Sequence, residues 1–265
     1  MQILTKDDLQ YLVAENISVP HGFTTRKGGV SQGYLASMNI GTRRGDDPEN
    51  VLKNYAILGN AIGFDPKKSV HTKQTHTDIV RIADESLWGA GLYAPDLTDC
   101  DALITNTPGT ALVVFTADCT PVLLHDPVTG AVGAVHAGWR GTAANIVGKT
   151  VAAMTKNFGC QPENIRAAIG PNIGKCCFET DRDVPDAISA LLGAESAPYI
   201  TQKGNKFFVD LKGVNACLLQ KAGVLSVDIS DHCTACNPDL YWSHRVVGSN
   251  RGSQGAIILC KEKEK

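Results

Sequence analysis

Two histidines and one cysteine in this sequence are of the types that bind transition metals. His76 lies in the segment QTHTDIV, Cys119 in FTADCTPVLLHDP and His136 in GAVGAVHAGWRGT. Two imidazoles and one thiolate form a ligand set that suits Zn²⁺ best and copper second. Three protein ligands would leave one coordination position open, which is typical of a catalytic metal site. Spacing alone favours the alternative of two core histidines and one buried cysteine.

The segments that carry Cys119 and His136 indicate a β-hairpin. Residues 120–125 and 131–137 are strand-like runs, and the residues Pro127 to Gly130 between them have the composition of a tight turn. Such a hairpin places the start of its first strand beside the end of its second. We therefore expect both residues at the same end of one sheet.

The sequence around these residues resembles a known family. The segments that carry the resemblance are KQTHTDIV, DCDALITNTPGTALVVFTADCTPVLLHD, GAVHAGWRGT and AIGPNIGKCCFET, and it runs from about His21 to about Cys260. The family is called multicopper polyphenol oxidases or laccase-domain proteins; members are also described as purine nucleoside phosphorylases, and some as peptidoglycan-editing factors. In this family the histidine of QTH, the cysteine of TADC and the histidine of HAGWRG bind zinc. The resemblance thus implies that His76, Cys119 and His136 are zinc ligands.

The resemblance also implies a fold and an activity. The fold would be of the α/β (α+β) class, a layered α/β/β/α sandwich of mixed sheets, with residues 1–265 as a single domain. The activity would be phosphorolysis of adenosine, inosine, guanosine or methylthioadenosine to the base and ribose 1-phosphate, with adenosine deamination as a second reaction. Zinc with an open position lowers the pKa of bound water to about 7, which suits that deamination. The expected ligands are zinc, with copper as the alternative metal, together with purine nucleosides and phosphate.

A deaminase of this kind also needs a proton carrier beside the metal. Asp118 directly precedes Cys119 and is the first candidate, but neighbours on a strand point to opposite faces, so this role requires a turn or bulge there. An aspartate that only satisfies a strand end is an equal alternative. His71 and His125 are further candidates, although on a continuous strand His71 and His76 would face opposite sides.

Phosphorolysis requires an anion pocket, and the segment HGFTTRKGGV is a candidate for it. Arg26 offers a planar fork for phosphate, and Gly28 and Gly29 would let backbone amides approach an anion. The resemblance matches Arg26 to the family's GFTTRxGGVS segment and Asn39 to the asparagine of its SxNxG segment. A solvated surface arginine is the alternative interpretation.

Other residues are candidates for binding substrate or phosphate. Arg140 in HAGWRGT stands at the start of an expected helix, where the helix dipole favours an anion, although a structural ion pair would explain it equally. Gln74 of the QTH segment is expected to contact substrate or phosphate. Many relatives carry an arginine where this chain has Tyr55. If that arginine holds ribose or phosphate, Arg43 or Arg44 must substitute for it here.

Two other motifs lie in the second half of the chain. Cys176 and Cys177 are adjacent, and Cys233 and Cys236 form a CxxC motif. A second metal or redox site is one hypothesis, but the pattern favours reduced structural cysteines. Nine cysteines, an odd number, do not indicate a disulfide framework. The segments 243–245, SHR, and 251–255, RGSQG, match a C-terminal pattern of the family and are expected to close the substrate cleft.

Strands and helices are expected to alternate around these motifs. Asp47 can cap a helix that starts at Pro48, keeps apolar spacing up to Ile62 and ends at Gly63. Another helix is expected to begin at Thr142 and stop near residue 159. Strands outnumber helices and several are joined by hairpin-length turns, which indicates a mixed sheet. Further strands are expected at 69–75, 78–83, 102–105, 111–115, 165–170, 207–209, 225–229 and 256–260, and further helices at 184–192 and 211–222.

Composition narrows the class of protein. With 265 residues, 43% of them hydrophobic and 20% charged, the chain has ordinary globular composition. The net charge of −2 predicts no surface for nucleic acid or for an anionic membrane. The sequence starts without a signal-peptide pattern and has no apolar run of roughly 18 residues, so we expect a cytoplasmic protein. Nothing in the sequence indicates its oligomeric state.

Three alternative functions fit parts of the pattern. A copper-dependent polyphenol oxidase would need more metal ligands than seven histidines and three methionines supply. A Cys/His hydrolase would use Cys119 as a thiolate activated by His136, and it would need that site free of metal. Editing of peptidoglycan precursors rests only on the name given to some relatives. Stoichiometric zinc, stoichiometric copper or no metal separates the nucleoside enzyme, the oxidase and the hydrolase.

Overall fold

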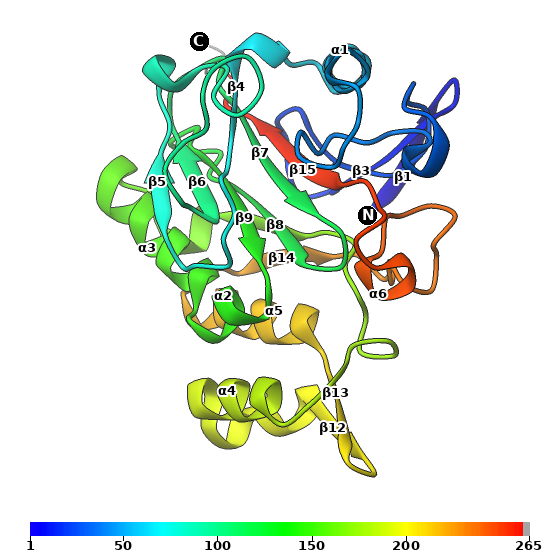
Figure 1. The fold of residues 1–265 in the computed structure, drawn as a ribbon. Coiled ribbons are helices and arrows are strands. Elements are labelled where there is room, and N and C mark those ends of the chain that lie inside the picture. The colour runs from blue at the N-terminus through cyan, green and yellow to red at the C-terminus, as the bar shows by residue number, and fades with distance from the viewer. Residues whose placement is uncertain (262–265) are drawn as a thin grey trace.

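A computed structural model describes residues 1–261, in which two six-stranded sheets pack face to face between layers of helices (Figure 1). The first sheet is antiparallel except for the pairing of β4 with β7. Its strands, in spatial order, are β1 (Gln2–Lys6), β2 (Leu9–Val13), β3 (His21–Thr24), β15 (Gln254–Leu259), β7 (Ala111–Thr116) and β4 (Ser69–His71).

The second sheet contains the hairpin predicted from the sequence, formed by β8 and β9. Its two edge pairs, β10 with β14 and β5 with β6, are parallel, and the pairs between them are antiparallel. The expected mixed-sheet α/β sandwich is therefore confirmed. The strands, in spatial order, are β14 (Ser226–Ile229), β10 (Arg166–Ile169), β8 (Thr120–His125), β9 (Val132–Ala137), β6 (Ala102–Thr105) and β5 (Val80–Ile82).

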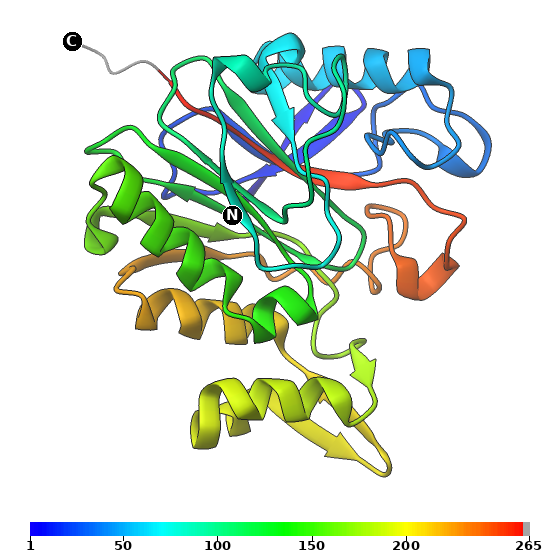
Figure 2. The ribbon, with the colours of Figure 1, turned by 60° about the vertical axis from the view of Figure 1, so that its left-hand side comes forward.

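Helices cover the outer face of each sheet. Helix α1 lies over the first sheet, and α3 and α5 lie over the second (Figure 1). Helix α4 and a small third sheet project from that helical side (Figure 2). The helices are α1 (Pro48–Ile62), α2 (Trp139–Ala143), α3 (Ile146–Phe158), α4 (Asp183–Leu192), α5 (Leu211–Lys221) and α6 (His244–Val247), and the small sheet is formed by β11 (Glu179–Thr180), β13 (Lys206–Val209) and β12 (Ile200–Lys203).

Most of the central strands are buried on both faces. In β6, Leu103 packs between the two sheets, whereas its neighbour Ile104 packs against the helices of the second sheet. Successive side chains of a strand point to opposite faces, so a strand between two apolar layers is apolar throughout. Full burial of one such side chain contributes roughly 1.5–3 kcal/mol to the free energy of folding. The two packed sheets carry the loops of the candidate site.

Most predicted elements are confirmed, and the departures have local causes. The helix after Asp47 spans Pro48–Ile62 and ends at Gly63, as predicted. The helix predicted from Thr142 is instead two helices, because Asn145 takes a left-handed conformation and its side chain caps α3. The strand predicted at 69–75 ends at His71, and the strand predicted at 78–83 is shortened to β5. Strands β1, β2, β3, β11 and β12 were not predicted.

No helix within residues 1–261 combines the length and the apolar character that a membrane span requires. The expectation of a single domain over residues 1–265 stays a prediction, and its last four residues lie outside the described part of the chain.

Candidate active site

The three predicted metal ligands meet at one end of the second sheet. Cys119 directly precedes β8, His136 lies in β9 opposite Pro121, and His76 belongs to the loop between β4 and β5. Their donor atoms all lie within 4.8 Å of one another. The rings of His76 and His136 are edge to face, with their centroids 5.0 Å apart. The hairpin therefore supplies two donors, as expected from the sequence, and the loop supplies the third.

A buried carboxylate holds the loop that carries His76. Asp101, fully buried, accepts hydrogen bonds from the backbone amides of Thr75 (3.2 Å), His76 (3.1 Å) and Thr77 (2.7 Å), and from the Thr77 hydroxyl (2.7 Å). His76 itself has a φ of 62°, which is strained for a residue other than glycine. The four hydrogen bonds fix this conformation and hence the position of the imidazole.

Asp101 also orients His136. Its Oδ1 lies 2.7 Å from Nδ1 of His136, so the other ring nitrogen is left to face Cys119. Burial alone would lower the pKa of His136, but the charges of Cys119 and Asp101 raise it to about 9. Burial would raise the pKa of Asp101, but its hydrogen bonds to His136 and Thr77 lower it to about 2. Sequence reasoning missed Asp101, although it stands in the DCDALIT segment directly before a strand.

The space between the donors also fits a metal ion. A Cβ atom at Gly138 would lie 2.7 Å from Nδ1 of His76 and 3.5 Å from Sγ of Cys119. Any larger residue at Gly138 would therefore displace a donor. Two imidazoles and one thiolate lie close together beside Gly138, and the carboxylate of Asp101 orients one of the imidazoles. A three-ligand metal site requires this arrangement.

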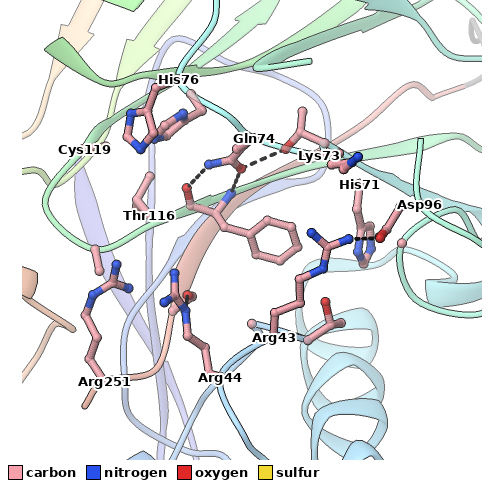
Figure 3. Close-up of a pocket in the computed structure, with 18 residues that line it drawn as sticks. Arg43, Arg44, His71, Lys73, Gln74, His76, Asp96, Thr116, Cys119 and Arg251 are labelled. Atoms are coloured by element: carbon pink, nitrogen blue, oxygen red, sulfur yellow. Dashed lines mark hydrogen bonds and ion pairs between the residues drawn. The ribbon is translucent and has the colours of Figure 1, made fainter. Parts of the chain in front are cut away.

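This donor cluster opens into a cavity with a cationic wall. Figure 3 shows Arg43, Arg44 and Arg251 on the side of the cavity opposite His76 and Cys119. Further lining comes from the loop at residues 41–44, from β4 and the loop after it, from residues 91 and 96, and from the end of β7 with the residues that follow. Of the two segments expected to close the cleft, 251–255 lines the cavity through Arg251 and Ser253, whereas none of residues 243–245 lines it.

Two of these arginines have no carboxylate partner among residues 1–261. Arg43 is ion-paired with Asp96, whereas Arg44 donates to the Ser253 hydroxyl (3.2 Å) and Arg251 to the Gly252 carbonyl (3.1 Å). Burial and the neighbouring Arg44 lower the pKa of Arg251 to about 10. Two guanidinium groups that face one cavity without an ion-paired carboxylate among the described residues form a site suited to an anion.

Gln74 and His71 also line the cavity. Gln74 is fixed by the backbone of Phe115, since its Nε2 donates to the carbonyl (2.7 Å) and its Oε1 accepts from the amide (2.6 Å).

His71 is buried, and burial lowers its pKa to about 3, so it is neutral. Because β4 ends at His71, the objection that His71 and His76 face opposite sides of one strand does not apply.

Tyr55 stands behind His71 rather than in the cavity. Its ring stacks on His71 at 5.0 Å, and its hydroxyl donates to the Ile40 carbonyl (3.1 Å). Many relatives carry an arginine where this chain has Tyr55. Arg43 and Arg44, the two possible substitutes for that arginine, both line the cavity.

Asn39 supports the cavity without lining it. The side chain is fully buried; Oδ1 accepts from the amides of Gly41 (3.0 Å) and Ser253 (2.9 Å), and Nδ2 donates to Asp46 (2.8 Å). It therefore joins the loop that carries Arg44 to the segment that carries Arg251. The contact with substrate predicted for Asn39 is corrected to a positioning role.

The structure does not bring Arg26 or Arg140 to the cavity. Arg26 donates to the carbonyls of Ala36 (3.1 Å) and Pro238 (2.9 Å), and its guanidinium lies 3.9 Å from the ring centroid of Trp242. Arg140 is exposed and stacks on Trp139 at 4.2 Å. The prediction that Arg26 binds phosphate is therefore corrected, because other groups occupy its fork.

Asp118 also lies outside the cavity. The chain does turn there, with a φ of 89°, but its carboxylate accepts from the Thr234 hydroxyl (2.6 Å), the Ser243 hydroxyl (3.0 Å) and the Arg245 amide (2.7 Å). The role of proton carrier predicted for Asp118 is corrected to anchoring the chain beside Cys119. His125 lies at the opposite end of β8 and does not reach the cavity either.

Comparison with known proteins places the chain among relatives that share nearly its whole length. The family described as multi-copper polyphenol oxidoreductase laccase matches residues 20–261. The purine nucleoside phosphorylase of Deinococcus radiodurans is 38% identical over 261 residues, which cover 98% of this chain and 97% of that protein. The purine nucleoside phosphorylase YlmD of Geobacillus stearothermophilus is 36% identical over 242 residues, which cover 89% of this chain and 87% of that protein. The crystal structure of YlmD from that organism superposes with a TM-score of 0.91 at 32% identity, covering 98% of this chain and 99% of the other.

Proposed function

This chain belongs to the multi-copper polyphenol oxidoreductase laccase family, and on that basis we propose that it is a zinc-dependent purine nucleoside phosphorylase that also deaminates adenosine. Its substrates would be adenosine, inosine, guanosine or methylthioadenosine together with phosphate. Relatives that match nearly the whole chain are named purine nucleoside phosphorylases, which supports the first activity. Deamination, zinc and the choice of nucleoside are proposed from the chemistry of the site.

One observation carries the proposal: a three-donor cluster and a pair of arginines without carboxylate partners within residues 1–261 face the same cavity. The arginines, Arg44 and Arg251, suit a phosphate. His76, Cys119 and His136 would hold zinc, which when bound would supply a Lewis acid that activates water at neutral pH. A nucleoside between these two groups would have its ribose near the phosphate and its base near the donor cluster.

Phosphorolysis then follows from the placement of the side chains. An oxygen of the phosphate bonds to C1′ of the ribose while the bond from C1′ to N9 of the purine breaks. The electron pair leaves with the base, which takes up a proton. Arg44 and Arg251 would hold the phosphate in place and balance its charge. Phe115, which is half-buried at the cavity wall, offers an apolar surface for the purine.

Both reactions are proposed to use the same bound nucleoside. Adenosine incubated with phosphate should give adenine and ribose 1-phosphate, whereas inosine should form with or without phosphate. Chromatography that separates adenine, inosine and hypoxanthine measures both reactions in one sample. Methylthioadenosine at saturating concentration should suppress deamination of adenosine, and undiminished deamination would contradict a shared site.

The alternative functions make different demands on the metal. A polyphenol oxidase of the multicopper type needs several copper ions, whereas His76 and His136 are the only histidines in the donor clusters of residues 1–261. A Cys/His hydrolase would need Cys119 and His136 free of metal. Metal analysis of the purified protein distinguishes them: about one zinc at this site supports our proposal, and one copper or no metal contradicts it. Peptidoglycan editing would require activity on a cell-wall precursor in place of a nucleoside.

A further inference from the structure

A second cluster of metal-binding side chains lies outside the cavity. Cys176 and Cys177 follow β10, and Cys233 and Cys236 follow β14. The four sulfur atoms all lie within 4.8 Å of one another, although the two pairs are far apart in the sequence. Sγ of Cys236 is 3.4 Å from that of Cys177 and 3.6 Å from that of Cys176. The sequence pattern favours reduced structural cysteines here, whereas the distances between the four sulfur atoms fit a metal site.

These distances fit four thiolates around a single ion. In a tetrahedron with metal–sulfur bonds of about 2.3 Å, the sulfur atoms are about 3.8 Å apart. A disulfide requires sulfur atoms about 2.0 Å apart, and all nine cysteines of the chain are free thiols in the structure. Four sulfur donors in a tetrahedral arrangement select zinc or iron, and they disfavour calcium and magnesium, which prefer oxygen.

The backbone prepares the cluster for a cation. The amide of Gly174 donates to Sγ of Cys233 (3.1 Å), and a Cβ at Gly174 would lie 3.3 Å from Sγ of Cys176 and 3.4 Å from Sγ of Cys233. A larger residue at position 174 would therefore crowd two of the sulfur atoms. Amide groups that donate to sulfur stabilise ligating thiolates, as outer hydrogen bonds do at metal sites generally.

A basic group lies beside the cluster. Lys212 is held against the carbonyls of Ser230 (2.7 Å) and His232 (2.6 Å). Four thiolates around one Zn²⁺ leave a net negative charge, which a neighbouring ammonium group stabilises.

We propose that Cys176, Cys177, Cys233 and Cys236 bind one structural zinc ion with a closed, all-sulfur coordination shell. The ion would join the segment after β10 to the segment after β14. The second of these segments carries Thr234, whose hydroxyl donates to Asp118 beside Cys119. By fixing the position of Thr234, the structural ion would also stabilise Asp118 and the backbone of Cys119 in the first cluster.

Counting zinc in matched variants tests this proposal. Protein purified under reducing conditions should hold two zinc ions per chain by mass spectrometry of the native protein. Cys119→Ala should hold one, and the double variant Cys176→Ser with Cys236→Ser should also hold one. Cys217→Ser, which changes a half-buried cysteine outside both clusters, should retain two. A Cys119→Ala protein without metal, or a double variant with two zinc ions, would overturn the proposal.

Two further measurements need no change in the four cysteines and no enzyme activity. Cobalt bound to the Cys119→Ala protein should show the intense near-ultraviolet absorption of several thiolates on one tetrahedral ion. Cys176 and Cys236 are exposed, so alkylation followed by peptide mapping should find them protected until a chelator is added. Equal alkylation before and after chelation, or a disulfide between any of the four, would refute the proposal.

Discussion

The two donor clusters of this molecule differ in composition and in what surrounds them. His76, Cys119 and His136 offer three donors, and they face a cavity. The other cluster offers four sulfur atoms, one of which accepts a hydrogen bond from a backbone amide, and none of its residues lines the cavity of the first cluster. Three donors leave room for a reacting group, whereas four close the coordination shell. In our proposal the same fold uses cysteine in two ways, as one ligand of an open metal site and as the whole ligand set of a closed one.

The supports of the two clusters differ as well. In the first, a buried carboxylate, Asp101, orients both the ring of His136 and the loop of His76. In the second, the amide of Gly174 contacts a sulfur directly. The clusters are nevertheless linked, since Asp118 next to Cys119 accepts a hydrogen bond from Thr234 between Cys233 and Cys236.

The largest effect should come from Cys119→Ala. Loss of the thiolate removes a ligand, so zinc at the first cluster and both nucleoside reactions should fall to background, while the four-sulfur cluster keeps its ion. Metal content and product formation measured on the same sample check this. Full metal occupancy in the variant would show that Cys119 is not a ligand.

Asp101→Asn should have the next largest effect. The amide keeps the size of the carboxylate but loses its charge and one acceptor for the ring of His136, so zinc affinity at the first cluster should fall by about 10–100-fold. Competition with a chelator measures that affinity. Asp78→Asn is the matched control, because Asp78 lies in the same loop but pairs with Lys149 instead of a ligand. Equal losses in the two variants would mean that Asp101 only stabilises the loop.

Arg44→Lys should raise the KM for phosphate about tenfold, since loss of the planar fork costs roughly 1.4 kcal/mol. Deamination should change little, because it consumes water and no phosphate. Arg26→Lys is the control and should leave the KM for phosphate unaltered, because Arg26 contacts Trp242 and two carbonyls instead of the cavity. A raised KM in Arg26→Lys alone would return the phosphate site to the HGFTTRKGGV segment.

The smallest effect concerns the stability of the metal-free protein. The pKa of His136 is raised to about 9, against about 6.5 in an unfolded chain. Its contribution to the free energy of unfolding is therefore complete below pH ~6.5 and is lost as the pH rises through about 9. Urea unfolding across this range should show the loss, and Cys119→Ala should show less of it. A flat profile for the metal-free protein would contradict the charge pairing of His136 with Cys119 and Asp101.

Local patterns predicted part of this molecule well. The hairpin of β8 and β9 follows from a turn of four residues, and α1 follows from Asp47 at one end and Gly63 at the other. The hairpin brings Cys119 beside His136 without help from distant segments. Elements of this kind are encoded by neighbours in the sequence.

The rest depends on contacts between distant segments. The guanidinium of Arg26 has the planar shape that suits phosphate. Its contact with Trp242, which is far away in the sequence, shows that the guanidinium is already engaged within the protein. Arg251 enters the cavity because Ser253 is joined to Asn39, far away in the sequence. Asp101 acts through backbone amides, which have no signature in the sequence. Residue types indicated the chemistry of the site, and tertiary contacts decide which residues take part.

The position of β15 in the first sheet has a consequence for how the protein is made. Residues 254–259 form an inner strand, inserted between β3 and β7, which both precede it by a long stretch of chain (Figure 1). Until the ribosome has released these residues, β3 and β7 each keep an unpaired edge of the kind that favours aggregation. The first sheet can therefore be completed only after residues 254–259 have been made, and the position of the Arg44 loop depends on the same step, because that loop is hydrogen-bonded to Ser253.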